Sequence, residues 1–83
     1  MTPRELAKAG LYLIKQAIIE HLTANPLGCG NSQIARALGI ESNFEGKSVN
    51  YLSYSVLGLL LKEKKVHYVG SGSNRRFFVG PKT

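Results

Sequence analysis

The sequence predicts an α+β fold, with a core of three helices followed by a β-hairpin wing at the C-terminus. Apolar residues recur at helical spacing over three segments, near residues 2–24, 33–38 and 47–64. Two short β-type runs, residues 66–69 and 75–79, then flank a Gly/Ser/Asn-rich turn. Because the chain has only 83 residues, we expect one domain spanning residues 1–83.

The first helix carries its own start and stop signals. Thr2 and Glu5 are spaced as a capping box, and Pro3 fits the first helical position. The helix is expected to end near Ala24, before an Asn-Pro pair. Gly10 marks either a kink or a true helix start nearer Leu11. Residues expected to face the core recur at helical spacing: Leu6, Gly10, Leu13, Ile14, Ala17 and Ile18.

The second helix is short and ends at a glycine. Asn31 or Ser32 is expected to cap a helix over residues 33–38, and Gly39 to end it in a left-handed conformation. Ala35 lies four residues before Gly39, where a larger side chain would push away the crossing third helix.

The third helix is expected to begin at Lys47 or Ser48. Its core-facing residues are expected to be Val49, Leu52, Val56, Leu59 and Leu60. On the opposite arc we expect Lys47, Tyr51, Tyr54 and Gly58, with Asn50 at its edge. In the hairpin, Phe77 and Val79 are expected to face the core, although a one-residue slip would bury Phe78 instead. Residues 27–30 are expected to add a one-rung strand.

Two stretches and the order of elements resemble the winged helix-turn-helix superfamily. Residues 33–40, QIARALGI, are similar to the second helix of that family, and residues 56–66, VLGLLLKEKKV, to the exit from its third helix. The resemblance implies a recognition helix that enters a DNA groove and a wing beside the phosphates. Two features depart from the family pattern. The connection from Gly39 to Lys47 is long, and Lys65 stands where a glycine usually precedes the wing.

The charge balance favours a polyanionic partner. Eleven Lys+Arg against five Asp+Glu give a net charge of +6, which favours nucleic acid first and an anionic membrane second. The N-terminus carries charges where a signal peptide would be apolar, and no apolar run approaches a membrane span. We therefore expect a cytoplasmic protein that does not contact a membrane.

Candidate DNA contacts come from the start of the second helix, the outer arc of the third helix and the hairpin. Asn50 offers a donor and an acceptor that match adenine, whereas Lys47 and the tyrosine hydroxyls suit phosphates. The alternatives are that one tyrosine packs against neighbouring segments and that the hairpin arginines are simply solvated. The candidates are Ser32, Gln33, Arg36, Lys47, Ser48, Asn50, Tyr51, Tyr54, Ser73, Asn74, Arg75 and Arg76.

Catalysis has little support in the sequence. No glutamate pairs recognisably with a histidine, and no metal-ligand spacing or nucleotide loop is present, so we expect neither an enzyme nor a cofactor. Cys29 is interpreted as a small buried hydrophobe, His21 as a structural histidine, and His67 as pointing outward.

The predicted function is a double-stranded DNA-binding module, either a small transcription regulator or the DNA-binding part of a larger DNA-processing protein. The sequence does not distinguish DNA from RNA. The alternative is a protein-interaction module that uses the tyrosine face, or Tyr12 and Ile19 on the far side of the first helix. Because the first helix is apolar nearly all round, it also allows a homodimer.

Overall fold

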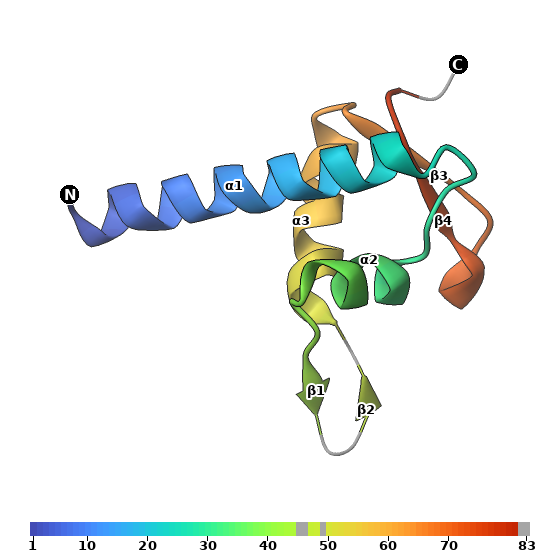
Figure 1. The fold of residues 1–83 in the computed structure, drawn as a ribbon, viewed down its shortest axis with the longest axis horizontal. Coiled ribbons are helices and arrows are strands. Elements are labelled where there is room, and N and C mark those ends of the chain that lie inside the picture. The colour runs from blue at the N-terminus through green and yellow to red at the C-terminus, as the bar shows by residue number, and fades with distance from the viewer. Residues whose placement is uncertain (45–46, 49, 82–83) are drawn as a thin grey trace.

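The computed structural model describes residues 1–44, 47–48 and 50–81, which contain three helices and two small antiparallel sheets (Figure 1). The elements are α1 Pro3–Ala24, α2 Asn31–Leu38, β1 Asn43–Phe44, β2 Lys47–Ser48, α3 Tyr51–Lys62, β3 Val66–Val69 and β4 Arg76–Val79. A single 3₁₀ turn, Gly72–Asn74, lies between β3 and β4. The predicted α+β class, with three helices followed by a C-terminal hairpin, is confirmed.

Helix α1 begins with the predicted capping box. The Thr2 hydroxyl accepts from the Glu5 backbone N–H at 3.2 Å, and the Thr2 N–H donates to the Glu5 carboxylate at 3.1 Å. The hydrogen bond from the Thr2 backbone, and then the Thr2 hydroxyl, hold the pKa of Glu5 below its usual value. The helix continues through Gly10 and ends at Ala24, as predicted.

Only part of α1 packs on the body of the protein, and its first turns extend away from it (Figure 1). Ile18 and Leu22 are fully buried, and Leu11, Ile14 and Ile19 pack against the core. These five residues fill the side of α1 that faces the body, so the prediction that Ile19 lies on the far side of the helix is wrong. The prediction that Leu6 and Leu13 face the core is therefore wrong, because both lie on a different side of the helix and are exposed.

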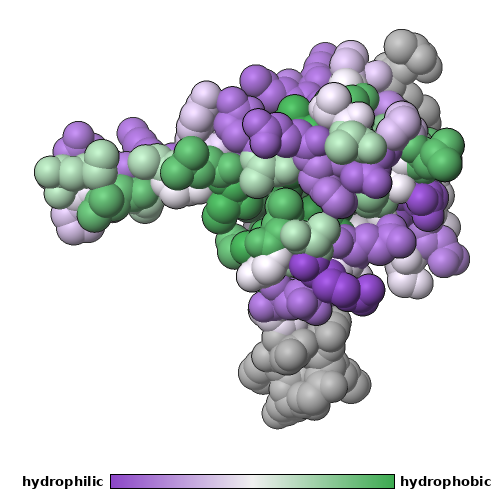
Figure 2. Space-filling model, viewed as in Figure 1, coloured by the Kyte–Doolittle hydropathy of each residue, from purple (hydrophilic) through white to green (hydrophobic). Residues whose placement is uncertain are grey.

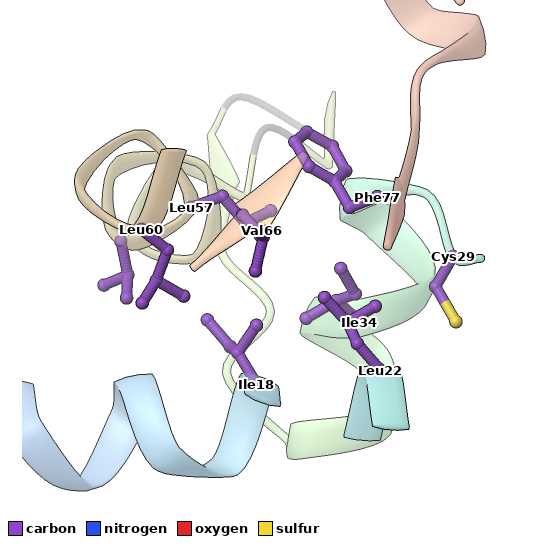
Figure 3. Packing of buried hydrophobic residues seen from close by; sticks show 9 residues of the cluster. Ile18, Leu22, Cys29, Ile34, Leu57, Leu60, Val66 and Phe77 are labelled. Atoms are coloured by element: carbon purple, nitrogen blue, oxygen red, sulfur yellow. The ribbon is translucent and has the colours of Figure 1, made fainter. Parts of the chain in front are cut away.

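The core gathers apolar side chains from all three helices and the hairpin (Figure 3). Its buried members are Ile18, Leu22, Cys29, Ile34, Val56, Leu57, Leu60, Val66 and Phe77. Ala35 is fully buried, as the close helix crossing required, and Gly39 has the predicted left-handed conformation with φ of 69°. The interpretation of Cys29 as a small buried hydrophobe is confirmed.

The start of α2 lies one or two residues before its predicted position. Gly30 is the N-cap, rather than Asn31 or Ser32, and the Gly30 N–H donates to the side-chain oxygen of Gln33 at 2.8 Å. Cys29 exchanges two backbone hydrogen bonds with Phe77, at 3.1 and 2.8 Å. The predicted one-rung strand between α1 and α2 is confirmed by this pairing.

Helix α3 begins at Tyr51, so the prediction that Lys47 and Ser48 start it is wrong. Those two residues form β2, which pairs with β1 in a hairpin that projects from the body (Figure 1). Asn50, directly before the helix, has φ of 48°. A right-handed α-helix cannot continue through this left-handed conformation, so α3 does not begin before Asn50.

The core face of α3 is also rotated from the predicted one. Leu57 and Ser53 are buried, whereas Leu52 and Leu59 are exposed, contrary to prediction; Val49 lies outside the described residues. Ser53 can be buried because its hydroxyl donates to Asn31 Oδ1 at 2.6 Å. The periodic pattern did not allow for a buried serine.

The C-terminal hairpin has the predicted strands to within one residue. β3 and β4 pair in antiparallel register, with Tyr68 opposite Phe77 and Val66 opposite Val79. Phe77 is buried as predicted, whereas Val79, the last residue of β4, is 42% exposed, contrary to prediction. His67 is half-buried rather than outward, and its Nδ1 lies 2.9 Å from the Gly80 carbonyl oxygen.

None of the described helices combines the length and the apolar character needed to cross a lipid bilayer.

Candidate nucleic-acid interface

A hollow of about 650 Å³ lies where the start of α2, Tyr54 of α3 and the hairpin turn meet. Seven of the predicted site residues line it: Ser32, Gln33, Tyr54, Ser73, Asn74, Arg75 and Arg76. The structure thus brings together residues from three separate parts of the sequence. Among the described residues that line the hollow, two are arginines and none is acidic.

The first turn of α2 presents backbone donors at this hollow. Its N-cap, Gly30, has no side chain to accept hydrogen bonds from the first-turn N–H groups. Gln33 turns its side chain back to the Gly30 N–H and so stabilises the cap from the other side. The free N–H groups and the positive end of the helix dipole favour an anion here.

Arg75 is held against two tyrosines at the opposite wall. Its guanidinium carbon lies 4.7 Å from the centroid of the Tyr68 ring, and Nη1 lies 3.5 Å from the Tyr54 hydroxyl oxygen. Its Nε is buried and has no hydrogen-bond partner among the described residues. Arg75 therefore has a fixed position and an unused donor. Tyr68, which fixes it, was not predicted as a site residue, although a cross-strand aromatic beside an arginine is a recognisable signal.

Arg76 has a structural role that was not predicted from the sequence. Its Nε donates to the Leu27 carbonyl oxygen at 3.2 Å, and Nη2 donates to the Gly28 carbonyl oxygen at 2.6 Å. Arg76 therefore ties β4 to the connection between α1 and α2, with two of its five N–H donors. It is also exposed and lines the hollow, so its contact with a phosphate stays a prediction.

Asn50 is not on the exposed arc of α3, contrary to prediction. It is only 2% exposed. Its Oδ1 accepts from the Ser42 N–H at 3.1 Å, and its Nδ2 donates to the Ser32 hydroxyl at 3.2 Å. Because both ends of the amide are used inside the fold, Asn50 does not present the pattern that matches adenine.

Tyr51 and Tyr54 do lie on the exposed face of α3, as predicted. Leu52 and Leu59 share the exposed surface of this helix, and no charged residue occurs between Tyr51 and Leu61. Before Lys62 in its last turn, the exposed part of α3 is therefore aromatic and apolar, with hydroxyl groups as its main donors.

The remaining predicted residues stand apart from the hollow. Arg36 is exposed, and its Nε lies 3.9 Å from Glu41 Oε2. Lys47 and Ser48 belong to β2, and their side chains fall outside the described part of the structure. Gly30, Asn31, Gly72 and Phe77 line the hollow although the sequence did not single them out. Of these four residues, only Gly30 could have been recognised from the sequence, because glycine directly before a helix can serve as its N-cap.

His21, the titratable side chain beside Cys29, has structural partners. His21 Nε2 lies 3.7 Å from the Cys29 sulfur, and its backbone oxygen accepts from Asn25 Nδ2 at 2.7 Å. No group of three or more His, Cys, Asp or Glu within the described ranges is arranged to hold a metal ion.

Comparison of the chain with protein-family models, with curated protein sequences and with solved structures gave no match in any of the three. The chemistry of the hollow and of the surfaces beside it is therefore the basis for assigning a function.

Proposed function

We propose that this protein is a winged helix-turn-helix module that binds double-stranded DNA, mainly through the backbone phosphates. The observation that carries the proposal is the hollow, which is lined by backbone donors, hydroxyls and arginine, with no acidic residue among its described lining. Three helices followed by an antiparallel hairpin are compatible with that fold. The net charge of +6 adds a long-range attraction for DNA.

In this proposal one phosphate occupies the hollow. It accepts hydrogen bonds from the first-turn N–H groups of α2 and from the terminal guanidinium nitrogens of Arg75, which lines the hollow. Ser73 and Asn74, in the turn of the hairpin, then reach the neighbouring phosphate. Tyr51 and Tyr54 direct their hydroxyls toward the groove from the first turns of α3.

We infer that the module discriminates weakly between DNA sequences. Base reading in the major groove depends on side chains that offer paired donors and acceptors. Asn50 is internal, and the exposed face of α3 offers tyrosine and serine hydroxyls beside leucines. Phosphate contacts position a protein on DNA without carrying sequence information, so affinities for different duplexes should be similar.

The exposed face of α3 also favours a second candidate, a winged helix that binds another protein. Tyr51, Leu52 and Leu59 expose aromatic and aliphatic surface on one helix, and the first exposed charge of that helix is Lys62 in its last turn. Apolar residues of this kind commonly mark a protein interface. The two candidates predict opposite results in a titration with DNA.

The deciding experiment measures binding to a random-sequence duplex by fluorescence anisotropy over a series of salt concentrations. The logarithm of the affinity should fall against the logarithm of the salt concentration by about 0.9 for each phosphate neutralised. We expect Arg75→Gln to weaken binding severalfold and to reduce this slope by about 0.9, because one phosphate contact is lost.

Lys62→Gln is the matched control, since it also removes one positive charge, in this case from an exposed side chain away from the hollow. Lys62 lies eight residues after Tyr54 on α3, about 12 Å along the helix axis from the residue that lines the hollow. It should leave the slope nearly unchanged, and thermal unfolding should show that both variants fold. Equal effects of the two variants on duplex binding would show that binding depends on net charge and not on a contact at the hollow. Absence of binding at low salt would reject DNA and favour a protein partner.

A further inference from the structure

Helix α1 carries two distinct apolar faces, and the fold covers only one of them. The core-facing residues are Leu11, Ile14, Ile18, Ile19 and Leu22. A second set, Leu6, Gly10, Leu13 and Ala17, forms what we call the exposed α1 seam. Leu6 is 56% exposed and Leu13 65% exposed, and the two small residues between and after them, Gly10 and Ala17, are half-buried. Figure 2 shows hydrophobic residues along the projecting arm of α1 and in the corner that the arm makes with the body.

The spacing of the exposed α1 seam is that of a coiled-coil interface. Its residues follow one another at intervals of four, three and four, which is the a/d pattern of a helix that pairs with another helix. The charged residues of the projecting arm are Arg4, Glu5 and Lys8, and they lie on other sides of the helix than the seam. The seam is thus free of charge over its whole length.

The seam is complementary in volume to an antiparallel copy of itself. When two α1 helices are aligned so that facing residue numbers sum to 23, Leu6 faces Ala17 of the second copy and Leu13 faces its Gly10. Each leucine then meets a small residue, and the two-fold axis repeats each pair. In a parallel alignment, leucine would meet leucine and Gly10 would meet Gly10, which leaves a gap.

Gly10 supports this arrangement because the isolated fold gives no reason for it. A Cβ placed there would have no heavy atom within 4 Å, and the residue lies inside a helix, where glycine is a poor former. In the antiparallel pair, the missing side chain makes room for Leu13 of the second copy.

Charge is complementary in the same alignment. Glu20 continues the spacing of the seam and faces Pro3 of the second copy, at the start of that helix. A carboxylate is stabilised at the positive end of a helix dipole, and Arg4 follows there in the sequence. The two-fold axis again repeats this contact, so both ends of the pair gain from it.

We propose that two copies of this protein associate through the exposed α1 seam as an antiparallel, two-fold symmetric pair. Each projecting arm lies along the part of α1 that is anchored on the other body. The 22 residues of α1 span about 33 Å, and a contact strip about 10 Å wide covers roughly 330 Å² per partner. Stable complexes usually cover about 800 Å² per partner, so this dimer is weak and depends on concentration. The proposal does not depend on DNA binding.

The test is sedimentation equilibrium of the full chain from about 10 µM to about 1 mM, a range that covers weak dissociation constants. The wild-type mass should rise from 9.1 kDa toward twice that value. Gly10→Leu should associate at least tenfold more weakly, because the added side chain occupies the space needed by Leu13 of the second copy. Its melting temperature at low concentration should not fall, since leucine is the better helix former.

Thr23→Leu is the matched control, because it adds a leucine to an exposed position of α1. In the antiparallel alignment, this position lies beyond the start of α1 in the second copy. The Thr23→Leu variant should associate like the wild type. A wild-type protein that stays monomeric throughout the range overturns the proposal. Unchanged association of Gly10→Leu would place the interface elsewhere, and stronger association would indicate a parallel pair. Loss of association in Thr23→Leu would show that the interface between the two copies is not confined to the exposed α1 seam.

Discussion

At the scale of single residues, Asn50 joins three segments that are separate in the sequence. Its side chain binds the Ser42 N–H and the Ser32 hydroxyl, and its carbonyl oxygen accepts from Asn31 and from Ser53. It also holds a left-handed conformation, which asparagine tolerates better than most residues. Its role is therefore to fix where α2 and α3 begin relative to each other.

Replacing Asn50 should accordingly reduce stability. Asn50→Ala removes both side-chain hydrogen bonds of the buried amide and puts alanine in a left-handed conformation that asparagine tolerates better, which together should cost about 2–4 kcal/mol. Asn50→Gly relieves the strain but still loses the amide, so its cost should be smaller. Urea unfolding followed by circular dichroism measures both. Unchanged stability of Asn50→Ala, combined with lost duplex affinity, would instead support the original expectation of a base-reading asparagine.

The position of this side chain could not be predicted from periodicity. Its hydrogen-bond partners lie 8 and 18 residues away in the sequence, so nothing in the local pattern distinguishes it from an exposed asparagine. The hydrogen bonds of Arg76 could not be predicted for the same reason, since the carbonyl groups that it binds are 49 and 48 residues away. Tyr54 and the hairpin turn were placed correctly because helix phase and turn composition are local signals.

At the scale of elements, ends defined by local chemistry were predicted and the others were not. The capping box of α1 and Gly39 after α2 each act within a few residues, and both are confirmed. The start of α3 depends on the β1–β2 hairpin, for which the sequence has no strong strand signal. The end of α3 is also unusual, because Lys64 has a positive φ of 60° where glycine is usual.

Lys64→Gly should therefore stabilise the protein by about 0.5–1 kcal/mol. Glycine removes the cost of a left-handed conformation, and part of that gain is offset by the larger entropy of the unfolded chain. Lys65→Gly is the control, because Lys65 has no positive φ and glycine there should destabilise. Both variants lose one charge, so only the backbone differs. Thermal unfolding at fixed salt distinguishes them, and equal shifts would contradict the backbone explanation.

At the scale of the whole molecule, the protein divides into a body and an arm. The core draws on α1 only from Leu11 onward, and residues 1–8 are exposed throughout. The proposed phosphate-binding hollow also lies entirely in the body, between α2, α3 and the hairpin. Folding and the proposed DNA contact therefore depend on one part of the molecule, and the proposed self-association on the other.

Removal of residues 1–8 should separate these properties. The truncated chain loses the Thr2 cap and an exposed stretch of helix, which should cost about 1 kcal/mol, or roughly 5 °C in melting temperature at this size. It also loses Leu6, and with it half of the leucine contacts of the antiparallel pair, so it should remain monomeric. Circular dichroism and sedimentation measure the two effects on the same sample. Global unfolding would show that the arm supports the body. A truncated chain that folds, stays monomeric and keeps the duplex affinity of the wild type would show that the body binds DNA as a monomer and that the arm serves only association.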